Sequence, residues 1–118
     1  MGQALTIQVR EERGHVIAAV AGEIDIATAA QLRERLFALA ESGRPLVADL
    51  DQVSFIDAVG LGALAGAARR AAEHGASLQV VCAQPHIWRL FRVTGLDSRI
   101  PLARTLTEAL QAPGGPPQ

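Results

Sequence analysis

Asp57 stands where an apolar, strand-like segment meets a run of small residues that is typical of a helix. A carboxylate at a helix start accepts a hydrogen bond from a free backbone amide and lies at the positive end of the helix dipole. The same amides can hold an anion, so a hydroxyl in this first turn, once phosphorylated, would bring its phosphate onto them. We therefore predict that Asp57 caps a helix, and that a phosphorylation switch would fit at this junction.

Groups for acid–base, nucleophilic or metal chemistry do not gather elsewhere. None of the histidines stands in a motif with a nucleophile; they are His15, His74 and His86. The segment 60–62 is Gly-Leu-Gly, but no Gly-Lys-Ser/Thr follows it, so it is not a phosphate-binding loop. His, Asp and Glu do not cluster at metal-ligand spacing. We expect a binding protein with no catalytic residues, no metal and no cofactor.

Composition narrows the class of protein. The chain has 118 residues, enough for one domain with its own core, and 49% of them are hydrophobic. The net charge of −1 argues against a nucleic-acid or membrane-surface partner. Cys82, the only cysteine, lies in an apolar run and is predicted to be a buried thiol. Residues 10–13 are charged, whereas a signal peptide would be apolar there. No apolar segment reaches the length of a membrane span. We therefore expect a cytoplasmic protein.

Hydrophobic periodicity predicts an alternation of strands and helices. The expected strands are 5–10, 15–21, 46–50, 53–56 after a turn at Asp51-Gln52, 77–82 and a short edge segment at 99–102. The expected helices are 28–43, 58–74, 85–93 and 104–111. A hairpin followed by β-α-β units predicts an α/β fold with a mixed β-sheet wrapped by about four helices. The domain is expected to span 1–112, with a disordered Pro/Gly-rich tail at 113–118.

Two helices carry local signals. Thr28 and Gln31 have the spacing of a capping box, in which the hydroxyl and the amide side chain satisfy free amides at the helix start. The helix from residue 58 contains Gly60, Gly62 and Gly66, each of which destabilises a helix interior by about 1 kcal/mol. We therefore predict that this helix packs closely against another backbone.

Three segments in order resemble the landmarks of one family. In chain order they are Gly22–Asp25 with the following Thr28, then Val53–Gly62, then Phe91–Asp97. Together they are similar to the STAS domain family, shared by bacterial anti-sigma factor antagonists and parts of sulphate transporters, over residues 5–111. The resemblance implies the mixed sheet described above and a role in protein–protein docking.

The resemblance also implies a mechanism. Antagonists of this family bind an anti-sigma factor, often a serine kinase with a histidine-kinase-like fold, and so release the sigma factor. That kinase phosphorylates a serine directly before the motif's glycine. Here the position before Gly60 is Val59, and Ala58 precedes it, so neither residue has a hydroxyl to phosphorylate. Ser54 and Thr28 are the other hydroxyls near this surface, although a strand-end serine and a helix cap explain them without a switch.

The expected partner-binding surface joins the start of the second helix to the loop before the first. Its residues are Glu23, Asp25, Thr28, Asp57, Ala58, Val59, Gly60 and Leu61. We predict that Ala58, Val59 and Leu61 form an exposed apolar patch there. The protein itself is expected to be a monomer or a weak dimer. Two other roles stay open: an accessory subunit of a membrane transporter's ATPase complex, and a scaffold subunit of a signalling assembly.

Overall fold

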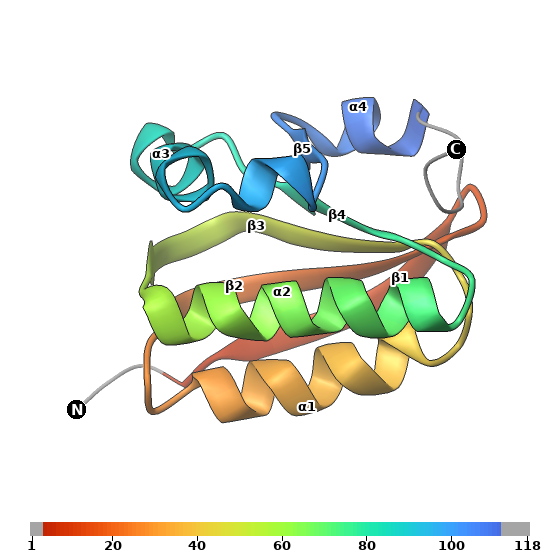
Figure 1. Cartoon of the computed structure of the whole chain (residues 1–118), viewed down its shortest axis with the longest axis horizontal. Helices are drawn as coiled ribbons and strands as arrows, with labels where there is room; N and C mark the ends of the chain where they lie inside the picture. Colours follow the sequence, from red (N-terminus) through yellow and green to blue (C-terminus); the bar gives the residue numbers. More distant parts are fainter. Residues whose placement is uncertain (1–3, 112–118) are drawn as a thin grey trace.

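The computed structural model describes residues 4–111, which form a mixed five-stranded sheet in the order β1-β2-β3-β4-β5 (Figure 1). The strands are β1 Thr6–Glu12, β2 His15–Ile24, β3 Leu46–Ile56, β4 Leu78–Val81 and β5 Leu102–Ala103. β1 pairs with β2 in antiparallel fashion, and the remaining neighbours are parallel. The predicted α/β class and mixed sheet are thus confirmed.

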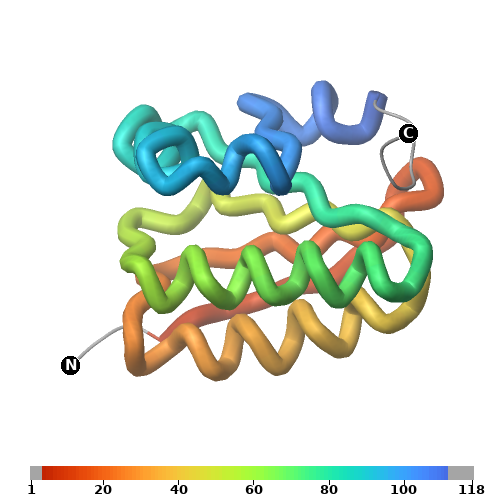
Figure 2. The backbone as a smooth tube through the Cα atoms, viewed as in Figure 1, coloured from red at the N-terminus to blue at the C-terminus, as the bar shows by residue number. Residues whose placement is uncertain are grey.

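The helices cover both faces of this sheet. They are α1 Ala29–Ala40, α2 Ala58–Glu73, α3 Pro85–Val93 and α4 Leu106–Gln111, with a short 3₁₀ turn η1 at Leu96–Ser98. α1 and α2 lie side by side, as the backbone trace in Figure 2 shows. The carboxyl ends of the parallel strands β2 and β3 meet at one edge, so the loops into α1 and α2 lie at the same end of the molecule.

Two hydrophobic clusters explain the layers. In β2 and its neighbours, alternate side chains point to opposite faces of the sheet. Ala18, Ala48 and Val80 belong to the large cluster under α1, α2 and α3. Ile17 and Val47 belong to the smaller cluster against α4. Because both faces are covered, the central strands are apolar on both sides, as is typical of parallel strands.

The predicted turn at Asp51-Gln52 is wrong: β3 continues through it as one strand. Ala19 pairs with Asp49 and Ala21 with Gln52, so β3 holds one more residue than β2 between these pairs. A bulge absorbs such an extra residue without ending the strand. Cys82 is buried as predicted, and the predicted tail at 113–118 lies outside the described residues.

Candidate functional site

The start of α2 is fixed to the end of the sheet by Asp57. Its backbone amide donates to the carbonyl of Ile24, 3.1 Å away, which joins the ends of β2 and β3. Its side-chain Oδ1 accepts from the amide of Gly60 at 3.0 Å. Asp57 is extended while the next residue is helical, as an N-cap requires. The predicted cap is confirmed, and the carboxylate already occupies one of the free amides of this turn.

Gly60 has a packing reason to be glycine. A Cβ built on it would lie 2.5 Å from Cγ2 of Ile24 and 2.8 Å from Cγ1 of Ile56, both of which are buried. α2 therefore packs closely on the strand ends, but the atoms that Gly60 approaches belong to side chains and not to the backbone that was predicted. Gly66 similarly faces the Phe37 ring of α1, at 2.8 Å from a built Cβ to Cζ. Gly62 is different, because no atom of residues 4–111, apart from its chain neighbours and the backbone of its own helix, lies within 4 Å of its Cβ position.

The loop from β2 to α1 is held by Asp25 and Thr28. Asp25 Oδ1 accepts from the amides of Ala27 and Thr28 at 2.9 and 3.1 Å. The Thr28 hydroxyl accepts from the Asp25 amide at 3.0 Å and donates to the Glu23 carbonyl at 2.8 Å. The predicted capping box is wrong: Thr28 makes no capping hydrogen bond to α1. Gln31 reaches instead to the carbonyl of Leu5 on the approach to β1, at 2.9 Å.

An apolar surface at the tip of these two loops consists of Ile26, Ala58 and Val59, which we call the tip patch. Ile26 is 78% exposed and Val59 48% exposed, and Ala58, which precedes Val59 in the chain, is also exposed. The prediction that Leu61 contributes to an exposed patch is wrong, since its side chain is 5% exposed and turned into the core. Ile26 was not among the residues predicted from the sequence; its large apolar side chain between Asp25 and Ala27, inside a turn, is the signal that could have identified it.

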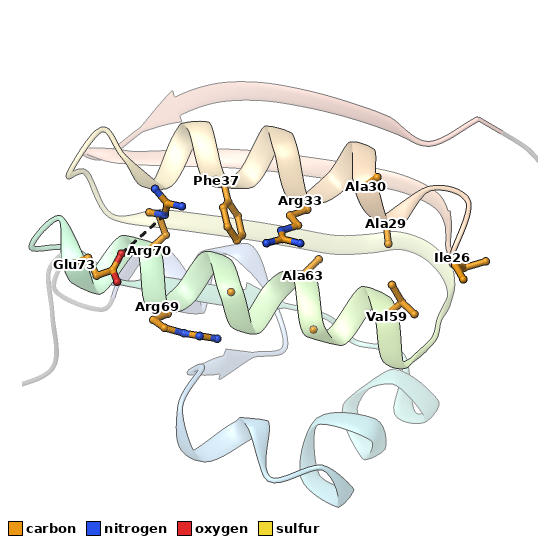
Figure 3. Close-up of a pocket in the computed structure, with 12 residues that line it drawn as sticks. Ile26, Ala29, Ala30, Arg33, Phe37, Val59, Ala63, Arg69, Arg70 and Glu73 are labelled. Atoms are coloured by element: carbon orange, nitrogen blue, oxygen red, sulfur yellow. Dashed lines mark ion pairs between the residues drawn. The ribbon is translucent and has the colours of Figure 1, made fainter.

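A groove between α1 and α2 begins at the tip patch and follows both helices (Figure 3). It has a volume of about 720 Å³, and Ile26, Val59 and Gly62 are among the residues that line it. Farther along, Phe37 of α1 lies between two arginines, with Arg33 and Arg70 guanidinium carbons 5.0 and 5.1 Å from its ring centre.

Charge along this groove is unbalanced. Arg33, Arg69 and Arg70 line it, against the single carboxylate of Glu73. Arg70 pairs with Glu41 at 2.7 Å and more loosely with Glu73 at 3.9 Å. Arg33 and Arg69 make no ion pair with any residue in 4–111. The groove thus has an apolar end at the tip patch and a basic remainder.

The two alternative hydroxyls differ in availability. The Thr28 hydroxyl is half-buried and held by the loop hydrogen bonds described above. Ser54 is exposed near the end of β3, and its carbonyl, not its hydroxyl, accepts a hydrogen bond from His86 Nε2 at 3.2 Å. Of the two, Ser54 is the one that an enzyme could reach without disturbing the loop.

The described residues do not converge on a catalytic or metal arrangement. Each histidine hydrogen-bonds a backbone carbonyl: that of Arg13, Arg70 or Ser54. No group of three or more His, Cys, Asp or Glu side chains within 4–111 is placed to hold a metal ion. Burial, with the nearby charge of Asp51, raises the pKa of the Cys82 thiol to about 11, which keeps it protonated and unreactive near neutral pH. None of the helices in 4–111 has the length and apolarity needed to cross a membrane.

This architecture is that of a small α/β domain, in which two of the exposed large apolar side chains, Ile26 and Val59, lie at the loops after β2 and β3. A family model for the STAS domain matches residues 6–109, and the chain belongs to that family. It is 34% identical over 99 residues to an anti-sigma-B factor antagonist of Bacillus subtilis, covering 84% of this chain and 91% of that protein. It is also 34% identical over 98 residues to the antagonist of the same name from Listeria monocytogenes, covering 81% and 86% of the two chains.

A solved structure agrees with these relatives. The crystal structure of an anti-sigma factor antagonist from Mycobacterium paratuberculosis is 33% identical and superimposes with a TM-score of 0.85. The alignment covers 94% of this chain and 97% of that one. The predicted resemblance to the antagonists of the STAS family is confirmed.

Proposed function

We propose that this protein acts as an anti-sigma factor antagonist, which sequesters an anti-sigma factor by docking through the tip patch and the groove behind it. It works by binding and not by catalysis, and its partner is expected in the cytoplasm. The observation that carries the proposal is the exposure of Ile26 and Val59 side by side in the lining of one groove, on loops that Asp57 and Asp25 hold in place. Exposed apolar groups on rigid supports are typical of docking surfaces.

The apolar and basic residues of this surface indicate which groups a partner must present to it. A complementary surface is apolar opposite the tip patch and acidic opposite Arg33 and Arg69. A specific contact of ordinary size would bury about 1,200–2,000 Å² in total, more than the tip patch alone supplies. The remaining predicted contact residues, Glu23, Asp25 and Thr28 in the first loop, flank Ile26 and would form the rim. Leu61 and Gly60 act from beneath, by supporting the helix start.

Val59 removes the usual phosphorylation site from this surface. Its exposed side chain is where a kinase would find a serine, and a phosphate there would add charge of about −2 beside the Asp57 carboxylate and inside an apolar contact. With valine in this position, the surface stays in the state that resembles the unphosphorylated form. We propose that docking to a histidine-kinase-like serine kinase is therefore not released by ATP.

The test uses this protein and its Val59→Ser variant as baits for affinity capture from host lysate, each with and without ATP, with mass spectrometry of bait and prey. The expected result is that both baits retain a kinase-like anti-sigma factor, and that ATP phosphorylates and releases only Val59→Ser. Val59→Asp should fail to capture the partner, whereas Val9→Asp, the same change at an exposed valine of β1, should capture it normally.

Four other results would overturn the proposal. Capture of transporter subunits alone would favour the accessory role in an ATPase complex, and self-associated bait of high mass would favour the scaffold role. Phosphorylation of the unmodified protein at Ser54 or Thr28 would show a relocated switch. Equal loss of binding in Val59→Asp and Val9→Asp would mean that the tip patch is not the docking surface.

A further inference from the structure

A second surface lies beside α3 and shares no residue with the groove between α1 and α2. It is a hollow of about 470 Å³, lined by Pro85, Trp88, Arg89, Arg92, Val93 and Arg104. Half of these residues are arginines, and no carboxylate from residues 4–111 lines the hollow. The chain as a whole has a net charge of −1, so this concentration of positive charge is local and not a consequence of a basic protein.

The arginines of this hollow are not used to hold the fold. Arg89, Arg92 and Arg104 are exposed and take part in none of the ion pairs found within residues 4–111. Arg104 lies over the Trp88 indole instead, with its guanidinium carbon 4.3 Å from the ring centre. Stacked on an aromatic ring, a guanidinium keeps its hydrogen-bond donors directed outward and loses little entropy when it binds.

An apolar group accompanies these charges. Val93, at the end of α3, is 76% exposed and lines the same hollow. Trp88 is half-buried, so part of its ring also faces the hollow. Arginine and tryptophan are the residues most enriched where binding energy concentrates in protein interfaces.

We propose that this hollow is a second docking surface, which takes an acidic peptide segment that carries an apolar side chain between its carboxylates. The guanidinium groups match carboxylates in a planar, two-pronged geometry. An apolar side chain between these carboxylates would cover Val93 and the open part of the Trp88 ring, which a free phosphate would leave in water. A concave site of this size suits a peptide segment better than the flat surface of an anionic membrane.

Trp88 makes the proposal directly measurable, because it is the only tryptophan in the chain and forms part of the hollow. The probe is a short capped peptide that alternates glutamate with leucine, titrated while Trp88 fluorescence is recorded. We expect a saturable change in emission with a dissociation constant below about 1 mM, weakening as salt is raised. The matched peptide with glutamine in place of glutamate should give no change.

Variants separate the two chemistries of the hollow. Arg89→Gln and Arg92→Gln should each weaken peptide binding by about five- to tenfold, whereas Arg35→Gln, at an exposed arginine of α1, should leave it unchanged. Val93→Ser should weaken binding of the leucine peptide but not of a glutamate–serine peptide. Thermal unfolding checks that the variants keep their stability, as surface changes should.

Other outcomes would overturn the inference. These are no response of Trp88 up to about 1 mM peptide, an equal response to the glutamine peptide, or equal weakening by Arg35→Gln. The same change with inorganic phosphate alone would show a general anion site, and a change only with phosphatidylglycerol vesicles would show a membrane contact. None of these results depends on the partner captured through the tip patch, so the two proposals stand or fall separately.

Discussion

Three glycines of α2 allow the packing of this helix to be tested by one substitution each. Gly60→Ala places a methyl group 2.5 Å from a methyl of Ile24, a side chain with no exposure, where ordinary contact needs at least 3.4 Å. Overpacking of this kind destabilises by about 1–3 kcal/mol. Because Gly60 lies in the first turn, the gain in helix propensity offsets only a small part of this.

Gly62→Ala should have the opposite effect. Its new methyl group meets nothing within 4 Å, and the position lies in the helix on an exposed face. The only effect left is the higher helix propensity of alanine over glycine, so we expect the variant to be more stable by about 0.5–1 kcal/mol. Gly66→Ala falls between the two, since its methyl group would lie 2.8 Å from Cζ of Phe37, and this atom is the far end of a half-buried side chain that can move aside.

Urea and thermal unfolding of the three variants would measure these differences. For a domain of this size, 1 kcal/mol moves the melting temperature by about 3–5 °C, so Gly60→Ala and Gly62→Ala should melt on opposite sides of the unmodified protein. A destabilised Gly62→Ala, or a Gly60→Ala as stable as the parent, would refute the packing described for α2. Gly62 also lines the groove between α1 and α2, and no contact within residues 4–111 requires a glycine there. We therefore expect the glycine to leave room for the partner, so that Gly62→Ala should also weaken capture of the partner.

Two further predictions concern single side chains. Asp57→Ala should lose about 1 kcal/mol of stability through loss of the N-cap, and Asp57→Asn should keep most of it, because the amide oxygen can still accept from Gly60; equal urea midpoints for the two variants would contradict this. For Cys82, burial raises the pKa of the thiol to about 11 in the folded protein from its ordinary value of 9.0, so the thiol of the unfolded chain ionises first and stability falls as pH rises from about 9 to 11. The slope should approach 1.4 kcal/mol per pH unit in this window and be absent below it. Cys82→Ala should flatten the profile, and a thiol reagent at pH 8 should label the protein only in urea.

The helices and strands could be predicted from the sequence because the signals that define them are local. α3 begins at Pro85 and ends at Val93 as expected, since proline suits the first turn of a helix and the apolar spacing shows where the helix packs. Asp57 was recognisable for the same reason: a cap needs only the residue type and the start of a helix.

The predictions were wrong where a residue far away in the sequence determines which contact a side chain makes. Thr28 and Gln31 have the spacing of a capping box, but Gln31 finds a carbonyl at Leu5 and Thr28 finds the Glu23 carbonyl, contacts that only the folded chain creates. Leu61 was expected on the surface because its neighbours are exposed, yet the rotation of α2 turns it inward. Ile26 was missed because exposure of an apolar loop residue depends on which elements surround it.

Under the proposed function, neighbouring positions in α2 carry separate requirements. Residue 60 must be glycine, because Ile24 and Ile56 leave no room for a Cβ, whereas the side chain at residue 59 points to solvent beside Ile26. Replacing a serine by valine at residue 59 therefore alters neither the Asp57 cap nor the contact of α2 with the sheet. It adds apolar area to the docking surface while removing the hydroxyl. An antagonist can lose its phosphorylation switch in this way without losing its fold or its partner, and restoring Val59→Ser should return the switch to an otherwise unchanged surface.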